Sequence, residues 1–341
     1  MKAAVLEKRG PDGLALREAP MPERRPGEAL MRVRAASLNR VDLYMRDDGQ
    51  GITHALPMVL GVDGAGEIVE ADPGSGLEAG MKAVLYPAAF CGACRYCLSG
   101  NQPLCKSLRI AGEHRDGTFA EYVAMPAVCF MPLPDDADLL EAATLPVAYL
   151  TAWRMLFGKR ALGPGETVLV TGIGGGVATA CLQLAVIAGA RVIVSSRRAE
   201  ALEHASALGA HACVDTSKGT LARGVLELTD GEGADMVIDS IGGETWSEAL
   251  KALRRGGRIV TCGATTGDNP SADLRRLFVR QLEIHGATLG DLDEFRRLIA
   301  VYRSGRLKPA IDRTYPLERI GEALARLQTG GQIGKIAVRI D

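Results

Sequence analysis

From residue 166 onward, short runs rich in β-branched and apolar residues alternate with helix-like segments. Helix-like segments at 178–190, 199–210 and 244–257 separate strand-like runs, which lie at 166–172, 191–196, 211–215, 234–240, 258–264 and 282–288. Strands that alternate with helices form parallel sheets, because the crossover between two parallel strands is made by a helix packed on the sheet. We therefore predict an α/β domain over 148–290, with a doubly wound parallel sheet.

The first of these strands runs into a glycine-rich turn and then directly into an apolar helix. Such a turn brings the backbone close to a pyrophosphate, and the helix N-terminus offers unpaired N–H groups to it. Read as G-x-G-x-x-G, the third glycine position holds Val177, whereas G-x-x-G-x-x-A fits Gly172, Gly175 and Ala178, and we prefer this second reading. The predicted phosphate-binding residues are Gly172, Gly174, Gly175, Gly176 and Val177.

The end of the second strand, VIVSSRRAE, indicates which dinucleotide binds. A site for NAD usually carries Asp or Glu there, to accept a hydrogen bond from the ribose 2′-OH. Ser195 and Ser196 can instead donate to a 2′-phosphate, and Arg197 can pair with it. We therefore predict NADP(H) as the cofactor; alternatively, Arg197 and Arg198 are only the solvated start of the next helix. Further predicted cofactor contacts are Thr144, Ser240, Cys262, Gly263 and Leu289.

Four cysteines near the end of the first third, Cys91, Cys94, Cys97 and Cys105, form two Cys-x-x-Cys steps that share one cysteine, followed by a fourth thiol. Four sulfurs close one tetrahedral Zn²⁺ and leave no coordination site open, so we predict one structural zinc that does no chemistry. The alternative is a pair of disulfides, although cysteines this close are poorly placed for two unstrained bridges.

The rest of the chain is organised differently. Short alternating strands at 28–37, 64–71 and 120–125 are separated by Gly/Pro turns, as in an antiparallel or barrel-like domain. Helix-like segments at 291–305 and 316–331 precede a last strand at 334–340. The net charge of -1 gives no reason to expect nucleic acid or an anionic membrane as a partner. We see neither a signal peptide nor a membrane span, and expect a cytoplasmic protein.

Together, the four-cysteine lobe, the run 60–66 (LGVDGAG), the segment 117–122 (GTFAEY) and the glycine-rich turn resemble the medium-chain dehydrogenase/reductase superfamily. This superfamily includes zinc alcohol dehydrogenases and NADPH:quinone reductases. The resemblance implies a GroES-like, β-rich catalytic domain at 1–147 with the zinc lobe at 86–112, a Rossmann domain at 148–290, and a C-terminal return to the catalytic domain at 291–341. It also implies an active site in the cleft between the two domains, and a homodimer.

The resemblance fails where alcohol dehydrogenases of the superfamily hold a second, catalytic zinc. Their ligands are a Cys in Cys-His-x-Asp, a His in Gly-His-Glu, and a Cys or Asp before the nucleotide domain. Here the first two positions hold Asn39 and Val62, and the third segment is 145–149 (LPVAY). Valine cannot ligate zinc, and an amide is a feeble ligand beside a thiolate. We therefore expect no catalytic metal.

The leading hypothesis is an NADPH-dependent reductase of quinones or α,β-unsaturated carbonyls, since the Asn-x-x-Asp step at Asn39 and Asp42 resembles the quinone reductase branch. Two alternatives are a zinc-dependent alcohol dehydrogenase with unusual ligands and a non-enzymatic NADPH-binding redox sensor. Asn39 can donate to a carbonyl oxygen, and Asp63 can orient the floor of the site. Tyr44 and His54 can donate a proton. The predicted catalytic residues are Asn39, Asp42, Asp63, Tyr44 and His54.

Overall fold

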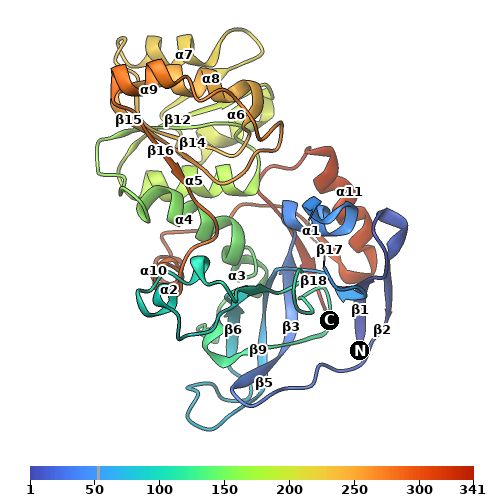
Figure 1. Ribbon diagram of the computed structural model, residues 1–341. Helices are drawn as coiled ribbons and strands as arrows, with labels where there is room; N and C mark the ends of the chain where they lie inside the picture. The colour runs from blue at the N-terminus through green and yellow to red at the C-terminus, as the bar shows by residue number, and fades with distance from the viewer. Residues whose placement is uncertain (52–53) are drawn as a thin grey trace. The chain divides into compact units, whose positions relative to one another are not determined.

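The computed structural model describes residues 1–51 and 54–341, which divide into two compact units. The first unit comprises Met1–Ala148 and Asp291–Asp341, and the second comprises Tyr149–Gly290. Figure 1 shows the blue start and the red end of the chain in the same unit. Among the described residues, no helix is both long enough and apolar enough to cross a lipid bilayer.

The first unit is built around a seven-stranded sheet. Its strands are β3 (Glu28–Ser37), β5 (Asp63–Ala71), β6 (Lys82–Leu85), β9 (Tyr122–Pro126), β10 (Phe130–Pro132), β17 (Ile311–Pro316) and β18 (Lys335–Arg339). The order is β10-β6-β5-β3-β18-β17, and β9 also pairs with β3. β3 is therefore central, and the C-terminal strand β18 lies antiparallel beside it, with Ala337 opposite Ser37.

Smaller elements complete this unit. A three-stranded sheet contains β1 (Lys2–Leu6), β2 (Leu14–Glu18) and β4 (Met58–Val59), and a two-stranded sheet pairs β7 (Ala88–Ala89) with β8 (Arg109–Ile110). The helices are α1 (Arg40–Asp47), α2 (Arg95–Leu98), α3 (Leu139–Ala142), α10 (Leu292–Arg303) and α11 (Ile320–Thr329). A short π-helical segment, η5 (Leu145–Tyr149), ends the first pass of the chain through the unit.

Glycines of the run 60–66 allow β5 to lie close to its neighbours. Gly61 has φ +100°, and a Cβ there would lie 2.6 Å from the backbone nitrogen of Phe119. A Cβ on Gly66 would lie 1.9 Å from the carbonyl oxygen of Arg32 in β3. Because only glycine avoids both contacts, this run fixes the approach of β5 to β3 and to the segment 117–122.

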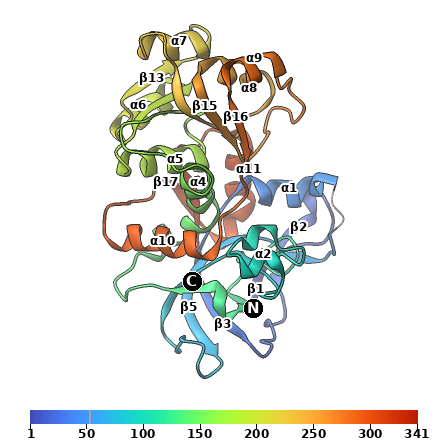
Figure 2. The ribbon, with the colours of Figure 1, turned by 60° about the vertical axis from the view of Figure 1, so that its left-hand side comes forward.

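The second unit is a six-stranded parallel sheet with helices on both faces (Figures 1 and 2). Its strands are β11 (Thr167–Val170), β12 (Arg191–Ser196), β13 (Ala212–Asp215), β14 (Ala234–Asp239), β15 (Leu253–Thr261) and β16 (Glu283–Gly286). Its helices are α4 (Leu150–Phe157), α5 (Gly176–Ile187), α6 (Ala199–Ala207), α7 (Leu221–Leu228), α8 (Gly243–Ala252) and α9 (Leu274–Arg280).

The strand order β13-β12-β11-β14-β15-β16 is that of a dinucleotide-binding Rossmann sheet, which confirms the predicted fold class. The order reverses between β11 and β14, and ligands of such sheets bind at this switch point. One predicted boundary is wrong, because α8 ends at Ala252 and residues 253–257 belong to β15. Gly256 has φ +68°, which a helix cannot contain, and Leu253 is fully buried as a strand residue beside Ala234.

Candidate functional site

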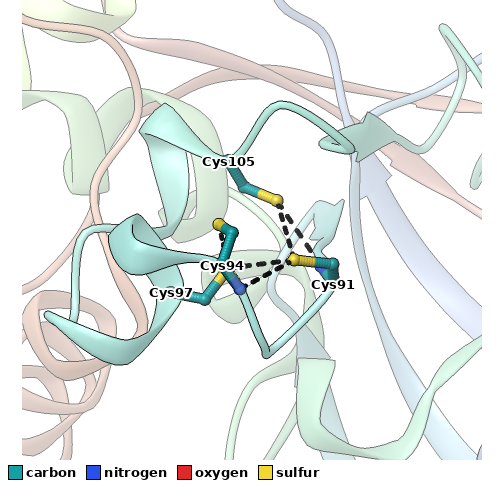
Figure 3. Close-up of side chains that lie close together, drawn as sticks. All are labelled: Cys91, Cys94, Cys97 and Cys105. Carbon is teal, nitrogen blue, oxygen red and sulfur yellow. Dashed lines mark hydrogen bonds between the residues drawn. The ribbon is translucent and has the colours of Figure 1, made fainter.

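The four cysteines of the lobe come together in the first unit between β7 and β8 (Figure 3). Their sulfur atoms all lie within 4.8 Å of one another. Individual Sγ–Sγ distances are 3.6 Å from Cys94 to Cys97, 3.6 Å from Cys105 to Cys91, and 3.9 Å from Cys91 to Cys97. Four sulfurs about 2.3 Å from a central zinc would be about 3.8 Å apart, so this arrangement fits a tetrahedral Zn²⁺.

The surroundings of the sulfurs also suit a metal centre. Backbone hydrogen bonds from Ala93 and Cys94, the latter at 3.3 Å, lower the pKa of the Cys91 thiol to about 6. Burial raises the pKa of Cys97 to about 12, so a nearby cation is needed to keep this sulfur as a thiolate at neutral pH. All eight cysteines are free thiols in the described chain, and none is in a disulfide.

A second polar cluster, which we call the Asp63 cluster, consists of Ser37, Asn39, Asp42, Asp63 and Lys335. All five are buried, and Asp63 is fully inaccessible. Asp63 Oδ2 accepts from Ser37 Oγ at 2.7 Å and from Asn39 Nδ2 at 2.7 Å, and its Oδ1 accepts from the backbone N–H of Val147 at 2.9 Å. Residues far apart in the sequence thus converge on one carboxylate.

Lys335, the first residue of β18, supplies the positive charge of the cluster. Its Nζ lies 3.1 Å from Asp63 Oδ2 and donates to Asn39 Oδ1 at 2.6 Å and to the carbonyl oxygen of Leu38 at 2.6 Å. An ammonium has three N–H donors, and each has an acceptor here. A buried lysine is tolerated because its charge is paired and hydrogen-bonded.

Asp42 lies beside this ion pair, and both the charge of Asp63 and that of Lys335 act on it. Its Oδ2 accepts from the backbone N–H of Asn39 at 2.7 Å, a bond that ties the first turn of α1 to its N-cap residue. Burial raises the pKa of Asp42 to about 7, and the nearby charge of Asp63 acts in the same direction. Hydrogen bonds from the backbone of Asn39 and Gly61 oppose this rise.

Tyr44 and His54 do not join the contacts of the Asp63 cluster. Tyr44 lies in α1 and is half-buried. His54 belongs to a different group, in which its Nδ1 lies 3.0 Å from Arg9 Nη2 and its Nε2 lies 3.8 Å from Glu113 Oε1. The structure therefore brings together Asn39, Asp42 and Asp63 from the predicted catalytic set, and places His54 elsewhere.

In the second unit, the predicted phosphate-binding turn follows β11 at the carboxyl edge of the sheet. Gly172 and Gly174 have φ of +64° and +121°, and Gly175 is the N-cap of α5. A Cβ on Gly172 would lie 2.6 Å from Ile241 Cδ1, whereas one on Gly175 would meet nothing within 4 Å. The twelve-residue helix that follows is long enough to present a positive N-terminal end.

The end of β12 carries the predicted determinants of cofactor choice. Ser195 and Ser196 are buried and Arg197 is exposed. Ser196 lies in register with Asp215 at the end of β13, so a carboxylate does stand on the neighbouring strand. That carboxylate is occupied, because Asp215 accepts from both the N–H and the hydroxyl of Ser217 and pairs with Lys218 at 3.1 Å.

The remaining predicted cofactor residues follow the neighbouring strands or lie in the first unit. Ser240 follows β14 and Cys262 follows β15, and Asp239 and Thr261 at the ends of these strands are in register. Gly263 is next to Cys262, and Leu289, with φ +49°, lies after β16. Thr144 is fully buried in the first unit and donates its hydroxyl to the carbonyl oxygen of Glu141 at 2.7 Å. Their contacts with a cofactor stay predictions.

Sequence reasoning missed Lys335, Ser37 and the backbone N–H of Val147. Lys335 left one signal in the sequence, as a charged residue at the head of a strand whose next three residues are apolar. Ser37 left the signal of a hydroxyl two residues before the Asn-x-x-Asp step. A backbone donor such as Val147 N–H has no sequence signature, since every residue except proline carries one.

The β-rich unit, the four-cysteine centre and the dinucleotide-binding sheet together define a class of protein, the dehydrogenases and reductases. Family models for the alcohol dehydrogenase GroES-like domain and for zinc-binding dehydrogenases match residues 25–135 and 176–304. The chain belongs to the medium-chain dehydrogenase/reductase superfamily, as the sequence motifs predicted, and it is an oxidoreductase of that type.

Full-length relatives agree with this assignment. A zinc-type alcohol dehydrogenase-like protein of Schizosaccharomyces pombe is 33% identical, over 97% of this chain and 96% of its own length. An NAD-dependent alcohol dehydrogenase of Saccharolobus solfataricus is 32% identical, over 94% and 95%. The crystal structure of an NAD-dependent alcohol dehydrogenase superposes with a TM-score of 0.96 at 36% identity and covers all of both chains.

The Asp63 cluster does not offer the donors of a catalytic zinc. The three segments in question meet there, but Asn39 Oδ1 already accepts from Lys335, and the segment 145–149 contributes an N–H donor. Val62 is apolar and 1% exposed. A metal ion at Asn39 and Asp63 would have to displace an ammonium or share their oxygens with it, which charge repulsion opposes.

Proposed function

We propose that the protein is a reductase of quinones or α,β-unsaturated carbonyls that uses NADPH and no catalytic metal. The observation that carries this proposal is the contact of Lys335 Nζ with both Asn39 Oδ1 and Asp63 Oδ2. The oxygens that would face a catalytic cation face a fixed ammonium instead. Alcohol oxidation by the metal route needs a Lewis acid to lower the pKa of the bound alcohol, whereas conjugated carbonyls are electrophilic enough to accept hydride without one.

The proposed reaction transfers hydride from C4 of NADPH to the β-carbon of an enone or to a quinone. The electron pair moves to the carbonyl oxygen, and NADP⁺ is released. Asn39 offers an Nδ2–H donor to the developing oxyanion, and water supplies the proton that completes the product. In the second unit, the turn at Gly172 and the N-terminus of α5 hold the pyrophosphate.

The preference for NADPH rests on Arg197, which is exposed at the end of β12, and on Asp215, whose carboxylate is occupied by Ser217 and Lys218. An exposed guanidinium can pair with a 2′-phosphate, which NADH lacks. Some relatives are named as NAD-dependent, so the preference of this chain for NADPH over NADH has to be measured. Replacing Arg197→Ala should weaken NADPH binding about tenfold, while the dissociation constant for NADH changes less than about twofold.

The change should be measured by fluorescence titration of both dinucleotides, with Arg191→Ala, at the opposite end of β12, as the matched control. Tighter binding of NADH than of NADPH to the unchanged protein would overturn the preference.

The test of the reaction itself has two parts. Elemental analysis of protein purified without added metal should give one zinc per chain, and NADPH oxidation should proceed with a panel of quinones and enones. Two zincs per chain with turnover of alcohols would instead identify an alcohol dehydrogenase with atypical ligands. Tight binding of NADPH without turnover of any substrate in the panel would favour a redox sensor.

We also propose a cytosolic homodimer. Eight free thiols suit a reducing compartment. β16 is an outer strand of the Rossmann sheet, and an unpaired strand edge can pair with a second copy. Large apolar side chains around this edge are exposed, with Phe278 at 70%, Leu274 at 69% and Val279 at 52% on α9 and Ile284 at 39% on β16. Large exposed apolar side chains are typical of a protein interface when they gather on one surface.

A further inference from the structure

The buried lysine of the Asp63 cluster, Lys335, donates all three of its N–H groups to acceptors inside the protein. Lys335 Nζ is 3.1 Å from Asp63 Oδ2 and 2.6 Å from both Asn39 Oδ1 and the carbonyl oxygen of Leu38. Its side chain is 3% exposed. With three acceptors for three N–H groups, the ammonium has no hydrogen left for a substrate. Any effect of Lys335 on chemistry must therefore pass through its partners.

Among these partners, the Asn39 amide can take two orientations, and the ammonium of Lys335 favours one of them. Its Oδ1 faces Lys335, and its Nδ2 faces Asp63 Oδ2 at 2.7 Å. A flip of the amide would place Oδ1 against the carboxylate and the NH₂ group against the ammonium. Both charge-assisted hydrogen bonds would be replaced by repulsive contacts, so the opposite charges on its two sides lock one orientation. Asp63 takes one of the two Nδ2 hydrogens, and the contacts found within residues 1–51 and 54–341 leave the other to be donated.

We propose that Lys335 is a positioning residue, which together with Asp63 fixes the Asn39 amide so that its Nδ2–H is presented to the substrate oxygen. This inference rests on the proposed function of Asn39 as a donor to that oxygen. The lysine would thus act in place of a catalytic cation by orientation, because it polarises and aligns a neutral donor without touching the substrate. Preorganisation of this kind lets a donor stabilise a developing oxyanion with no reorganisation.

Replacing Lys335 alone would leave Asp63 as a buried carboxylate without its counter-ion, and we expect this single variant to fold poorly. The decisive variant is therefore the pair Lys335→Met with Asp63→Asn, because removing both charges of a buried ion pair is often close to neutral for stability. The matched control is Lys82→Met in β6, which removes another lysine hydrogen bond in the same sheet, from Nζ to the carbonyl oxygen of Ala137.

The kinetic test is a cycle between this double variant and Asn39→Ala. We expect kcat/KM for enone or quinone reduction to fall about 10- to 100-fold in the double variant, with kcat carrying most of the loss and with NADPH affinity unchanged. Asn39→Ala should cost a similar factor, and the triple variant should be no slower than either. Losses that multiply in the triple variant, or a double variant as fast as the Lys82→Met control, would overturn the positioning role.

A second measurement needs no turnover. The chain has three asparagines, Asn39, Asn101 and Asn269, so selective ¹⁵N labelling gives three side-chain NH₂ pairs. The pair lost in Asn39→Ala belongs to Asn39. In the double variant, where Asp63→Asn adds a fourth pair, the Asn39 pair is the one lost in the triple variant. Its hydrogens should exchange at least about tenfold faster with water in the double variant, and unchanged exchange would refute the locked orientation.

The two measurements separate the proposals. If the Asn39 amide exchanges slowly but the protein reduces no quinone or enone, the proposed function and the role of the amide toward substrate are both wrong. An active protein whose Asn39 amide is indifferent to Lys335 would sink this inference alone.

Discussion

Asp42 and Asp63 are neighbouring buried carboxylates with different environments. Asp63 touches the ammonium of Lys335, whereas Asp42 is held by backbone N–H donors. Burial raises the pKa of Asp42 from 3.8 to about 7, because the backbone N–H donors and the charge of Lys335 offset desolvation and the nearby charge of Asp63 only in part. The Asp63 cluster therefore contains one ion pair, between Asp63 and Lys335, and one carboxyl, that of Asp42, whose pKa lies near 7.

This difference predicts a pH dependence of stability. Because the folded state holds the Asp42 proton more tightly than the unfolded state, stability contributed by this group is present below about pH 4 and is lost as pH rises to about 7. Asp42→Asn removes the titration. Between pH 5 and pH 8, the free energy of unfolding of the unchanged protein should fall relative to that of the variant by about 1 to 3 kcal/mol.

Urea unfolding at several pH values, with zinc present, measures this difference. Asp293→Asn is the matched control, because the Asp293 side chain is 61% exposed and pairs with Arg297 on the surface of α10. Parallel pH curves for Asp42→Asn and the unchanged protein would contradict the prediction.

At this scale, part of the site could be predicted from sequence. Asn39 and Asp42 stand three apart after a strand, Asp63 precedes a glycine, and the resemblance to the superfamily singles out all three as site residues. Lys335 could not be found in this way, since its contact with Asp63 joins residues 272 positions apart. His54 is a predicted catalytic residue because it is the only imidazole before the cysteine lobe. Its position in the sequence does not show which way its side chain points, and the ring contacts Arg9.

Among the elements, the cysteine lobe has little apolar packing to hold it. β7 and β8 have two residues each and α2 has four. Its large apolar side chains Leu98 and Leu104 are 75% and 49% exposed. Elements this short are not stable alone, so the geometry of the lobe must depend on a cross-link such as a bound metal.

We therefore predict that Cys97→Ser abolishes zinc binding and frees the lobe without unfolding the sheet around β3. Elemental analysis should fall from one zinc per chain to less than about 0.1, because three sulfurs bind zinc far more weakly than four. Trypsin should then cut at Arg95, Lys106 or Arg109 at least about tenfold faster.

Cys213→Ser, outside the lobe in β13, is the control and should keep both its zinc and its resistance to trypsin. Full zinc content in Cys97→Ser would refute the assignment of this cysteine as a ligand.

Element boundaries show where local patterns suffice. β3 and β12 lie at the predicted residues 28–37 and 191–196. In β3, Arg32 and Arg34 alternate with apolar residues, and β12 contains a run of β-branched residues, 192–194. The segment 253–257 was predicted as the end of a helix, since the helical periodicity continues to Leu253. Pairing of Leu253 with Ala234 in β14 overrides that local preference. β17 was not predicted, because its polar sequence, IDRTYP, lacks a strand pattern and its pairing with β18 defines it.

For the whole molecule, the exposed edge of the second unit predicts assembly. Phe278→Asp combined with Ile284→Lys places charges in the apolar patch beside β16, so a dimer formed through this edge should weaken at least about 100-fold. Analytical ultracentrifugation should show dimers of the unchanged protein and monomers of the variant at micromolar concentration. Val128→Asp, at a residue 47% exposed in the first unit, should remain dimeric. A variant that sediments like the unchanged protein would refute this edge as the interface.

The position of β18 beside β3 has a consequence for the order in which the chain folds during synthesis. The second unit is continuous, so all of its strands have been made once residue 290 has left the ribosome. The first unit is not, because the partner of Asp63 is made 272 residues later. Until then its central strand lacks a neighbour and its carboxylate lacks a counter-ion. Residues 1–148 therefore cannot complete their fold until residues 291–341 have been synthesised. A chaperone that shields this unit would act on residues 1–148 while the rest of the chain is translated.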